Sequence, residues 1–142
     1  LTIMKELKIN HLAVLAGIVL QFVIGFLWYG PLFGEAWMEM VGLDLATVEA
    51  NPPDAGTWIT NILTAVASVY LLAWLFVKLK VSSLVKGAFL GFLIGFVFVL
   101  MANKTSSAFA GDPYGLAWIT GGFTTVRLSL AGAILGIWKK EA

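Results

Sequence analysis

Four long apolar stretches constrain the fold of this chain more than any other feature. They cover about residues 9–30, 57–77, 84–102 and 114–138. The hydrocarbon core of a bilayer is about 30 Å thick, and a helix needs roughly 20 apolar residues to cross it. We therefore predict an all-α integral membrane protein: a four-transmembrane-helix bundle forming one domain over residues 1–142. The apolar run of the first stretch is longer than that of a cleaved signal peptide, so we expect this stretch to be a membrane span.

Composition excludes most water-soluble classes of protein. The chain is 60% hydrophobic and 12% charged, whereas a soluble domain is about a quarter charged. A domain this small has too much surface to hide that many apolar residues from water. A net charge of +1 gives no general attraction to nucleic acid. We expect the lipid bilayer, and no nucleic acid, as a partner.

The residues available for chemistry are few. The chain has no cysteine, which excludes disulfides and thiolate metal sites. Its one histidine, His11, has no group of carboxylates nearby in the sequence with which to form a metal site. No phosphate-binding loop, dinucleotide fingerprint or nucleophile–base pair occurs. We expect no catalytic residues, no metal and no cofactor, and hence no enzyme.

The charged residues predict an orientation. Seven of the nine basic residues precede the first stretch, bracket the turn between the second and third, or follow the fourth. Six of the eight acidic residues lie on the opposite side. Short loops rich in lysine and arginine stay in the cytoplasm. We expect a multi-pass protein of the bacterial cytoplasmic (inner) membrane with both termini in the cytoplasm.

The outer loop, residues 31–56, is expected to contain a short interfacial helix over about residues 33–42. Phe33, Trp37, Met40 and Val41 recur at the spacing of one helix face. An amphipathic helix of this kind lies in the membrane interface, although a cap helix packed on the bundle fits the same pattern. Gly42 suits its end, and Asp54 or Thr57 can cap the second span.

Glycines predict the helix-packing faces. Small residues allow close helix contact in lipid, and they recur at four-residue spacing within three of the spans. The pattern fits contacts inside one bundle, and it also fits an oligomer interface. The candidate packing residues are Gly17, Gly25, Gly87, Gly91, Gly95, Gly132 and Gly136.

Arg127 is the one charge expected near the middle of the membrane. It lies about 11 residues into the fourth span, roughly 16 Å from its outer end at 1.5 Å per residue. Counting along the other spans places polar residues at or near that depth. The candidate intramembrane polar site comprises Arg127, Gln21, Ser68, Asn61, Thr64 and Thr124.

Three interpretations of Arg127 remain open, because no acidic residue is expected at its depth and an unpaired charge there is costly. It binds an anion or lines a water-filled path. It is a structural anchor held by Gln21, Ser68 and backbone carbonyls. Or it pairs with an acidic residue or an anionic lipid phosphate on a neighbouring molecule.

The stretch from Trp28 to Met38, WYGPLFGEAWM, resembles the signature of a bacterial membrane family known as domain of unknown function 1761. The closing GAILGIW of residues 132–138 resembles the last helix of that family. The resemblance covers nearly the whole chain and implies the four-span layout without implying an activity. Arg127 departs from the uncharged polar residues expected there. The first motif also reads as an interfacial corner made of Trp28, Tyr29, Gly30, Pro31, Gly34 and Trp37, in which Gly30-Pro31 ends the first span.

The sequence offers glycine-rich faces for helix packing and no residues for a cofactor site, and the expected function follows from these two features. We expect a small non-enzymatic membrane protein, a structural or accessory subunit of a homo-oligomer or of a larger membrane complex. The alternative is a small oligomeric transporter or channel with an anion-accessible path around Arg127.

Overall fold

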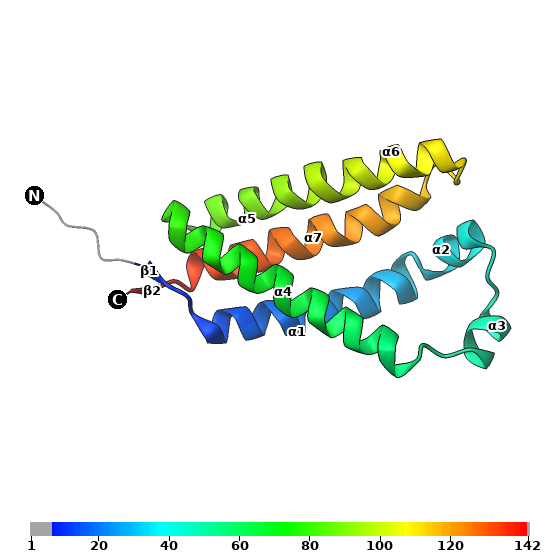
Figure 1. The fold of residues 1–142 in the computed structure, drawn as a ribbon, viewed down its shortest axis with the longest axis horizontal. Coiled ribbons are helices and arrows are strands. Elements are labelled where there is room, and N and C mark those ends of the chain that lie inside the picture. The colour runs from blue at the N-terminus through cyan, green and yellow to red at the C-terminus, as the bar shows by residue number, and fades with distance from the viewer. Residues whose placement is uncertain (1–6, 142) are drawn as a thin grey trace, which may run out of the picture.

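The structure, a computed structural model, describes residues 7–141. Four helical segments are long and apolar enough to cross a membrane, His11–Leu32, Ala55–Leu79, Leu84–Ala110 and Leu116–Ile137, and they form one elongated bundle (Figure 1). The predicted all-α, four-span fold is confirmed. We call the end with α2 and α3 the outer end, and the end with both strands the inner end.

The spans are built from several elements. The first joins α1 (His11–Leu27) to a π-helical turn, η1 (Trp28–Leu32), and the second is α4 (Ala55–Leu79). The third is one continuous rod of α5 (Leu84–Leu93), π-helical η2 (Ile94–Leu100) and α6 (Met101–Ala110). The fourth is α7 (Leu116–Ile137). Two short helices, α2 (Gly34–Val41) and α3 (Leu45–Ala50), occupy the outer loop.

Side-chain caps explain where several helices begin. Asn10, Asp54 and Ser83 accept hydrogen bonds from backbone N–H groups of the first turns of α1, α4 and α5, which otherwise lack partners. Gly42 and Gly111 end α2 and α6 in the left-handed conformation, with φ of 73° and 74°. Of the two residues expected to cap the second span, Asp54 is the cap, and Thr57 supplies the N–H group from which it accepts a hydrogen bond. The expected end of the short helix at Gly42 is confirmed.

The closest contact in the bundle joins α5 and η2 to α7. A Cβ atom on Gly87 would overlap the carbonyl of Gly132, and one on Gly91 would overlap the carbonyl of Leu128. A Cβ atom on Gly95 would lie 2.6 Å from the Cα atom of Thr125. The two backbones therefore touch along the seam, which only glycine permits.

The core at the inner half lies between α1, α4 and α7. Val14, Val69 and Leu72 are the largest fully buried side chains, and Leu128 and Ala131 of α7 belong to the same cluster. Gly17 fits this region because a Cβ atom there would meet Val69 at 3.0 Å and Ala131 at 3.5 Å. Gly136 likewise lies against the backbone of Ser83, and Gly25 against the ring of Phe123.

The outer half of α4 leaves the bundle. In Figure 1 α4 crosses α1 and then diverges from α7 toward α3. Every residue from 51 to 64 is exposed, whereas Ala65 and Val69, further along the same helix, are buried. The first ten residues of this 25-residue helix are therefore exposed, and Asn61 keeps a hydrogen bond to Gln21 of α1.

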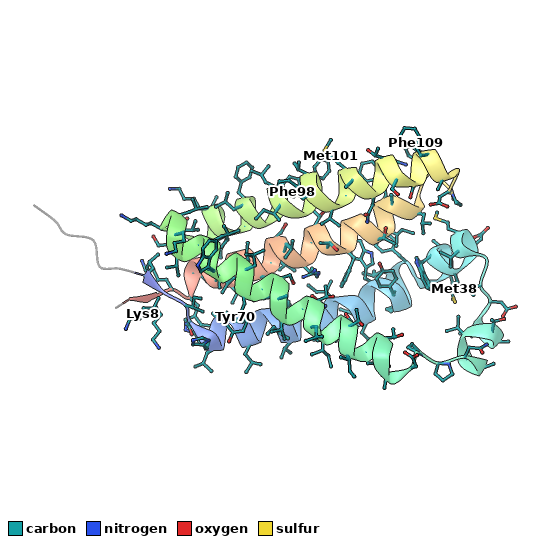
Figure 2. The ribbon with its side chains drawn as sticks, viewed as in Figure 1. Lys8, Met38, Tyr70, Phe98, Met101 and Phe109 are labelled. Carbon is teal, nitrogen blue, oxygen red and sulfur yellow. The ribbon has the colours of Figure 1, made fainter. Side chains whose placement is uncertain are left out.

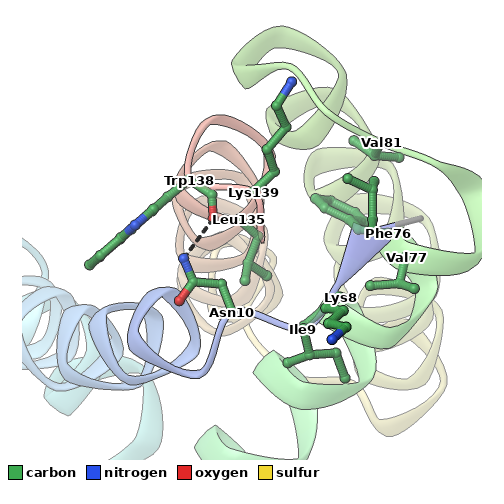
Figure 3. Close-up of a pocket in the computed structure, with 11 residues that line it drawn as sticks. Lys8, Ile9, Asn10, Phe76, Val77, Val81, Leu135, Trp138 and Lys139 are labelled. Carbon is green, nitrogen blue, oxygen red and sulfur yellow. Dashed lines mark hydrogen bonds between the residues drawn. The ribbon is translucent and has the colours of Figure 1, made fainter. Parts of the chain in front are cut away.

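The inner end is closed by contacts between the two ends of the described chain. β1 (Leu7–Lys8) pairs antiparallel with β2 (Lys140–Glu141). The Nδ2 group of Asn10 donates a hydrogen bond to the carbonyl of Trp138 over 3.0 Å, as Figure 3 shows beside Leu135, Phe76 and Val81. These residues surround a cavity of about 20 Å³, close to the size of one water.

Three features differ from the sequence predictions. The third helix does not end near Ala102 but continues to Ala110. Its polar residues do not interrupt it, because the Thr105 hydroxyl donates to the carbonyl of Met101. The helix α3 was not predicted. The first span does not end at Gly30 but kinks there, with φ of −108° and ψ of −105°, and continues to Leu32.

Large apolar side chains cover the outside of the bundle. Phe98, Met101 and Phe109 project outward from the third rod (Figure 2) and are 75%, 50% and 92% exposed. An exposed apolar surface of this extent is stable only against lipid or another apolar surface. The chain is therefore a multi-pass membrane protein in contact with the bilayer.

Candidate functional site

Arg127 is buried in α7, with 7% of its surface exposed. Its Nη1 atom donates a hydrogen bond to the Ser68 hydroxyl of α4 over 3.0 Å, and its guanidinium carbon lies 5.9 Å from the centre of the Phe123 ring. Its Nε atom has no hydrogen-bond partner within the described residues. The predicted proximity of Arg127 and Ser68 is therefore present, and the buried Nε–H of the guanidinium is left without a partner among the described residues.

A second polar contact joins α1 to α4. Gln21 is 4% exposed, and its Nε2 atom donates to the Oδ1 atom of Asn61 over 3.3 Å. The Oε1 atom of Gln21 is buried and lacks a partner within residues 7–141. An uncompensated amide oxygen in an apolar environment costs about 1–3 kcal/mol, so this atom calls for a donor.

Four of the six predicted polar residues thus form two hydrogen-bonded pairs, and the other two, Thr64 and Thr124, belong to neither. Thr64 is exposed, and its hydroxyl donates to the carbonyl of Thr60 on the same helix. Thr124 is half-buried on α7, and its carbonyl oxygen would lie 3.2 Å from a Cβ atom on Gly95. Neither threonine side chain has a described hydrogen bond to Arg127 or Gln21.

A cleft of about 450 Å³ opens between the first span, the outer half of α4 and α7. Its polar lining residues are Gln21, Asn61 and Tyr29, and the rest are aromatic or small. Sequence reasoning did not single out the phenylalanines, because a phenylalanine within an apolar span looks the same whether it faces lipid or a cleft. The lining residues are Gln21, Phe22, Gly25, Phe26, Tyr29, Trp58, Asn61 and Phe123.

The predicted corner after the first span is a packed junction. The indole N–H of Trp28 donates to the carbonyl of Ile119 in α7 over 2.9 Å. The Tyr29 ring lies 5.6 Å from that of Trp37 and 5.5 Å from that of Phe123. A Cβ atom on Gly34 would come within 2.5 Å of the Tyr29 carbonyl, so Gly34 is needed for close approach after the Gly30-Pro31 kink.

Two further polar contacts lie at the ends of the bundle. At the inner end, Nδ1 of His11 lies 2.8 Å from the Tyr70 hydroxyl. At the outer end, the Lys104 ammonium donates to the carbonyl of Tyr114 over 2.6 Å and lies over its ring. In residues 7–141, no group of three or more histidine, aspartate or glutamate side chains is placed to hold a metal ion.

Two aspartates of the outer loop have perturbed acidities. The Thr57 backbone N–H and then its hydroxyl hold the pKa of Asp54 below the usual range for a carboxyl. Hydrogen bonds from Thr47 lower the pKa of Asp44 in the same way. Both carboxylates cap helices, and the N–H groups they accept stabilise the charged form.

Comparison with known proteins identifies a family. A family model described as "Protein of unknown function (DUF1761)" matches residues 12–136. No curated protein and no solved structure was found to match the chain. The matched segment runs from the first turn of α1 to the last turn of α7 and includes both polar pairs and the cleft. The chain therefore belongs to the DUF1761 family of proteins.

Proposed function

We propose that this protein is a non-enzymatic membrane subunit that assembles with copies of itself or with a larger membrane complex through the outer half of α4. One observation carries the proposal: every residue from 51 to 64 is exposed. A membrane span normally packs along its length against the helices of its own bundle. In α4, by contrast, the side chains of the first ten residues are exposed and not covered by the other helices of the bundle.

The exposed stretch has the residues that membrane helices use to pair. Gly56, Thr60 and Thr64 recur every four residues on one face, which we call the α4 stripe. The Thr60 hydroxyl donates to the Gly56 carbonyl and the Thr64 hydroxyl to the Thr60 carbonyl, each over 2.8 Å. With their hydroxyls already bonded, these side chains present a smooth, small surface that another helix can approach closely.

The glycine seam between α5 and α7 provides the contrast. Gly87, Gly91 and Gly95 are buried against α7, so their close approach is already used inside the bundle. A Cβ atom on Gly56 would meet only the Asp54 carboxylate, at 3.5 Å. The α4 stripe is therefore the better candidate for contact with a second molecule.

We further propose the bacterial inner membrane as the location, with both termini in the cytoplasm. Lys8, Lys78, Lys80 and Lys86 lie at the inner end of the bundle, and Glu35 and Glu39 lie on α2 at the outer end. This asymmetry supports the orientation because short basic loops are retained in the cytoplasm.

The absence of cysteine makes the assembly testable by single-cysteine cross-linking in native membranes. Thr60→Cys on the α4 stripe should form a covalent higher-mass species under mild oxidation if a second copy is there, or with a short bifunctional reagent if another protein is. Phe98→Cys, which is 75% exposed on the opposite rod, is the matched control and should stay monomeric. Equal cross-linking at both positions, or none at Thr60→Cys, would contradict the proposal.

A second candidate function is an oligomeric transporter or channel with an anion-accessible path around Arg127. The unpartnered Nε atom of Arg127 favours it, because a buried guanidinium has donors to offer an anion. Chloride flux into proteoliposomes tests it. Flux that Arg127→Leu abolishes while cross-linking persists would favour the conduit, and no flux with the unaltered protein would exclude a chloride path.

A further inference from the structure

The contact between α1 and α7 has a register that can be followed residue by residue. The two helices run in opposite directions, since α1 starts at the inner end beside β1 and α7 returns to that end at β2 (Figure 1). A Cβ atom on Gly17 of α1 would meet that of Ala131 at 3.5 Å, and one on Gly25 would meet the Phe123 ring at 3.5 Å. Eight residues outward along α1 therefore correspond to eight residues back along α7.

Gln21 and Arg127 lie opposite each other in this register. Gln21 is midway between the two glycines of α1, and Arg127 is midway between the two α7 residues that those glycines face. Residues four apart in a helix share a face, so both side chains belong to the contact between α1 and α7. They are 4% and 7% exposed. The register therefore places a buried amide and a buried guanidinium at one level of the bundle.

Each of these side chains holds one buried atom without a hydrogen-bond partner within residues 7–141. In Gln21 this atom is Oε1, an acceptor, and in Arg127 it is Nε, whose N–H group is a donor. Across the described chain, these are the two buried side-chain nitrogen or oxygen atoms that lack a partner. Leaving a buried polar atom unpaired destabilises a protein, and here the unpaired donor and the unpaired acceptor complement each other.

The burial of the two atoms argues against a partner from outside the protein. Neither atom has appreciable accessible surface, so the partner of each must come from the groups packed around it. A chloride ion would accept from Nε without donating to Oε1, and its charge would face the negative end of the Gln21 amide. The last side-chain torsion of glutamine has a broad minimum, so a small rotation can turn Oε1 toward the Nε–H group.

The partners on α4 extend the arrangement to a third span. Gln21 donates to Asn61 through Nε2 over 3.3 Å, and Arg127 donates to Ser68 through Nη1 over 3.0 Å. Asn61 and Ser68 are seven residues apart, about two turns, and so lie on the same side of α4. Hydrogen bonds therefore lead from α4 to α1 and from α7 to α4, and a bond between Gln21 and Arg127 would join them.

We propose that Gln21 is the second hydrogen-bond partner of Arg127, with the Nε–H group of Arg127 donating directly to Oε1 of Gln21. This bond closes a polar ring of Asn61, Gln21, Arg127 and Ser68, which fastens α4 to α1 and α7 at the level where α4 leaves the bundle. The guanidinium is then held by neutral groups of its own chain. Its Nε–H group is not free for an anion, and the ring forms without the assembly proposed for the α4 stripe.

Nuclear magnetic resonance of the full chain in nanodiscs tests the bond directly. The sequence has one arginine and one glutamine, so nitrogen isotope labelling of these two residue types gives one Nε–H signal and one side-chain amide. The Arg127 Nε–H proton should exchange slowly with water and show a nuclear Overhauser contact to the Gln21 side chain. Adding chloride at constant ionic strength should leave its chemical shift unchanged.

Variants test the same bond through stability. Gln21→Leu should raise the unfolding equilibrium constant about tenfold, because it leaves the Nε–H group of Arg127 unpaired. In an Arg127→Met background the same change should lose most of that effect. Thr125→Val is the matched control, since Thr125 is 6% exposed and its hydroxyl donates to the Gly121 carbonyl of its own helix. Its effect should be the same in both backgrounds.

Several results would overturn the proposal. Fast exchange of the Nε–H proton, a contact to water in place of the Gln21 side chain, or a saturable shift with chloride would each assign this donor to another group. Equal effects of Gln21→Leu in both backgrounds would show that the two side chains are not coupled. If a variant lacks helical circular dichroism or a single elution peak in detergent, the signals of the unaltered chain decide the question.

Discussion

Replacing Gly91 by alanine should destabilise the bundle, because α5 and α7 touch there through their backbones. The new Cβ atom would overlap the Leu128 carbonyl oxygen, and it would lie 2.6 Å from the Leu128 carbonyl carbon and 3.1 Å from the Ser129 nitrogen. None of these atoms is the end of a flexible side chain, so the two helices must separate. Overpacking of this kind costs about 1–3 kcal/mol, and more where the backbone has to move.

Gly25→Ala is the matched control for this substitution. A Cβ atom at Gly25 would meet only the Phe123 ring, at 3.5 Å, which is an ordinary contact. Both changes exchange glycine for alanine within a span, and alanine favours helix by up to about 1 kcal/mol. We therefore expect Gly25→Ala to be neutral or slightly stabilising. The gain in helix propensity is common to both variants, so they should differ by the overpacking cost of about 1–3 kcal/mol.

The assay is unfolding in mixed micelles of a mild detergent and dodecyl sulfate, followed by circular dichroism. The free energies of unfolding of both variants are compared with that of the unaltered chain under the same conditions. Equal stability of Gly91→Ala and Gly25→Ala would refute the backbone contact between α5 and α7. A loss of stability in Gly25→Ala alone would refute the packing described around Phe123.

Three further predictions concern other parts of the molecule. Ser68→Ala should destabilise the protein by about 1–3 kcal/mol, since it removes the hydrogen-bond partner of the buried Arg127 Nη1. In the same unfolding assay, the double variant Ser68→Ala/Arg127→Met should recover part of that loss, and simple additivity of the two changes would count against the pair. Because hydrogen bonds lower the pKa of Asp54 in the folded state, the stability contributed by this cap is complete above the unfolded pKa and is lost as the pH falls through the folded pKa; hydrogen exchange in the first turn of α4 should speed up in that acidic range, while Asp54→Asn should show no such dependence. A cysteine in place of Glu49 should react with an impermeant maleimide added outside intact cells, and one in place of Lys80 should react only after lysis; the reverse pattern would invert the proposed orientation.

Depth and periodicity predicted the parts of the fold that lipid dictates. The four spans follow from apolar length alone, and Asp54 was recognisable as a cap because it precedes an apolar run after Pro52 and Pro53. Counting at 1.5 Å per residue placed Arg127 and Ser68 at one level, and they bond over 3.0 Å. Both inferences depend on local or one-dimensional information.

The missed features depend on which helix faces which. The sequence does not say that Gln21 hydrogen-bonds Asn61, because several polar residues lie at a plausible depth and only the crossing of α1 and α4 selects this pair. Trp28 looked like a membrane-interface residue, and its indole N–H instead bonds the Ile119 carbonyl of α7. The π-helical turn at Gly30 and Pro31 lies where Gly34 of α2 comes close to the Tyr29 carbonyl, a contact that the sequence does not reveal.

The divergence of α4 was also beyond sequence reasoning. Residues 57–77 are apolar enough to predict a span, but they do not predict that its outer part leaves the bundle. The glycines of α5 are the conspicuous small residues, and they are buried against α7. The less conspicuous Gly56, Thr60 and Thr64 remain exposed, and the proposed assembly depends on them.

The mass of the purified protein in nanodiscs is the measurement that tests assembly most directly. Native mass spectrometry should find the unaltered chain as a homo-oligomer or bound to another membrane protein. It should find the double variant Gly56→Leu/Thr60→Leu as a folded monomer, because the bulky side chains block the α4 stripe. A monomeric unaltered chain at every protein-to-lipid ratio, or an oligomer that the double variant leaves intact, would contradict the account.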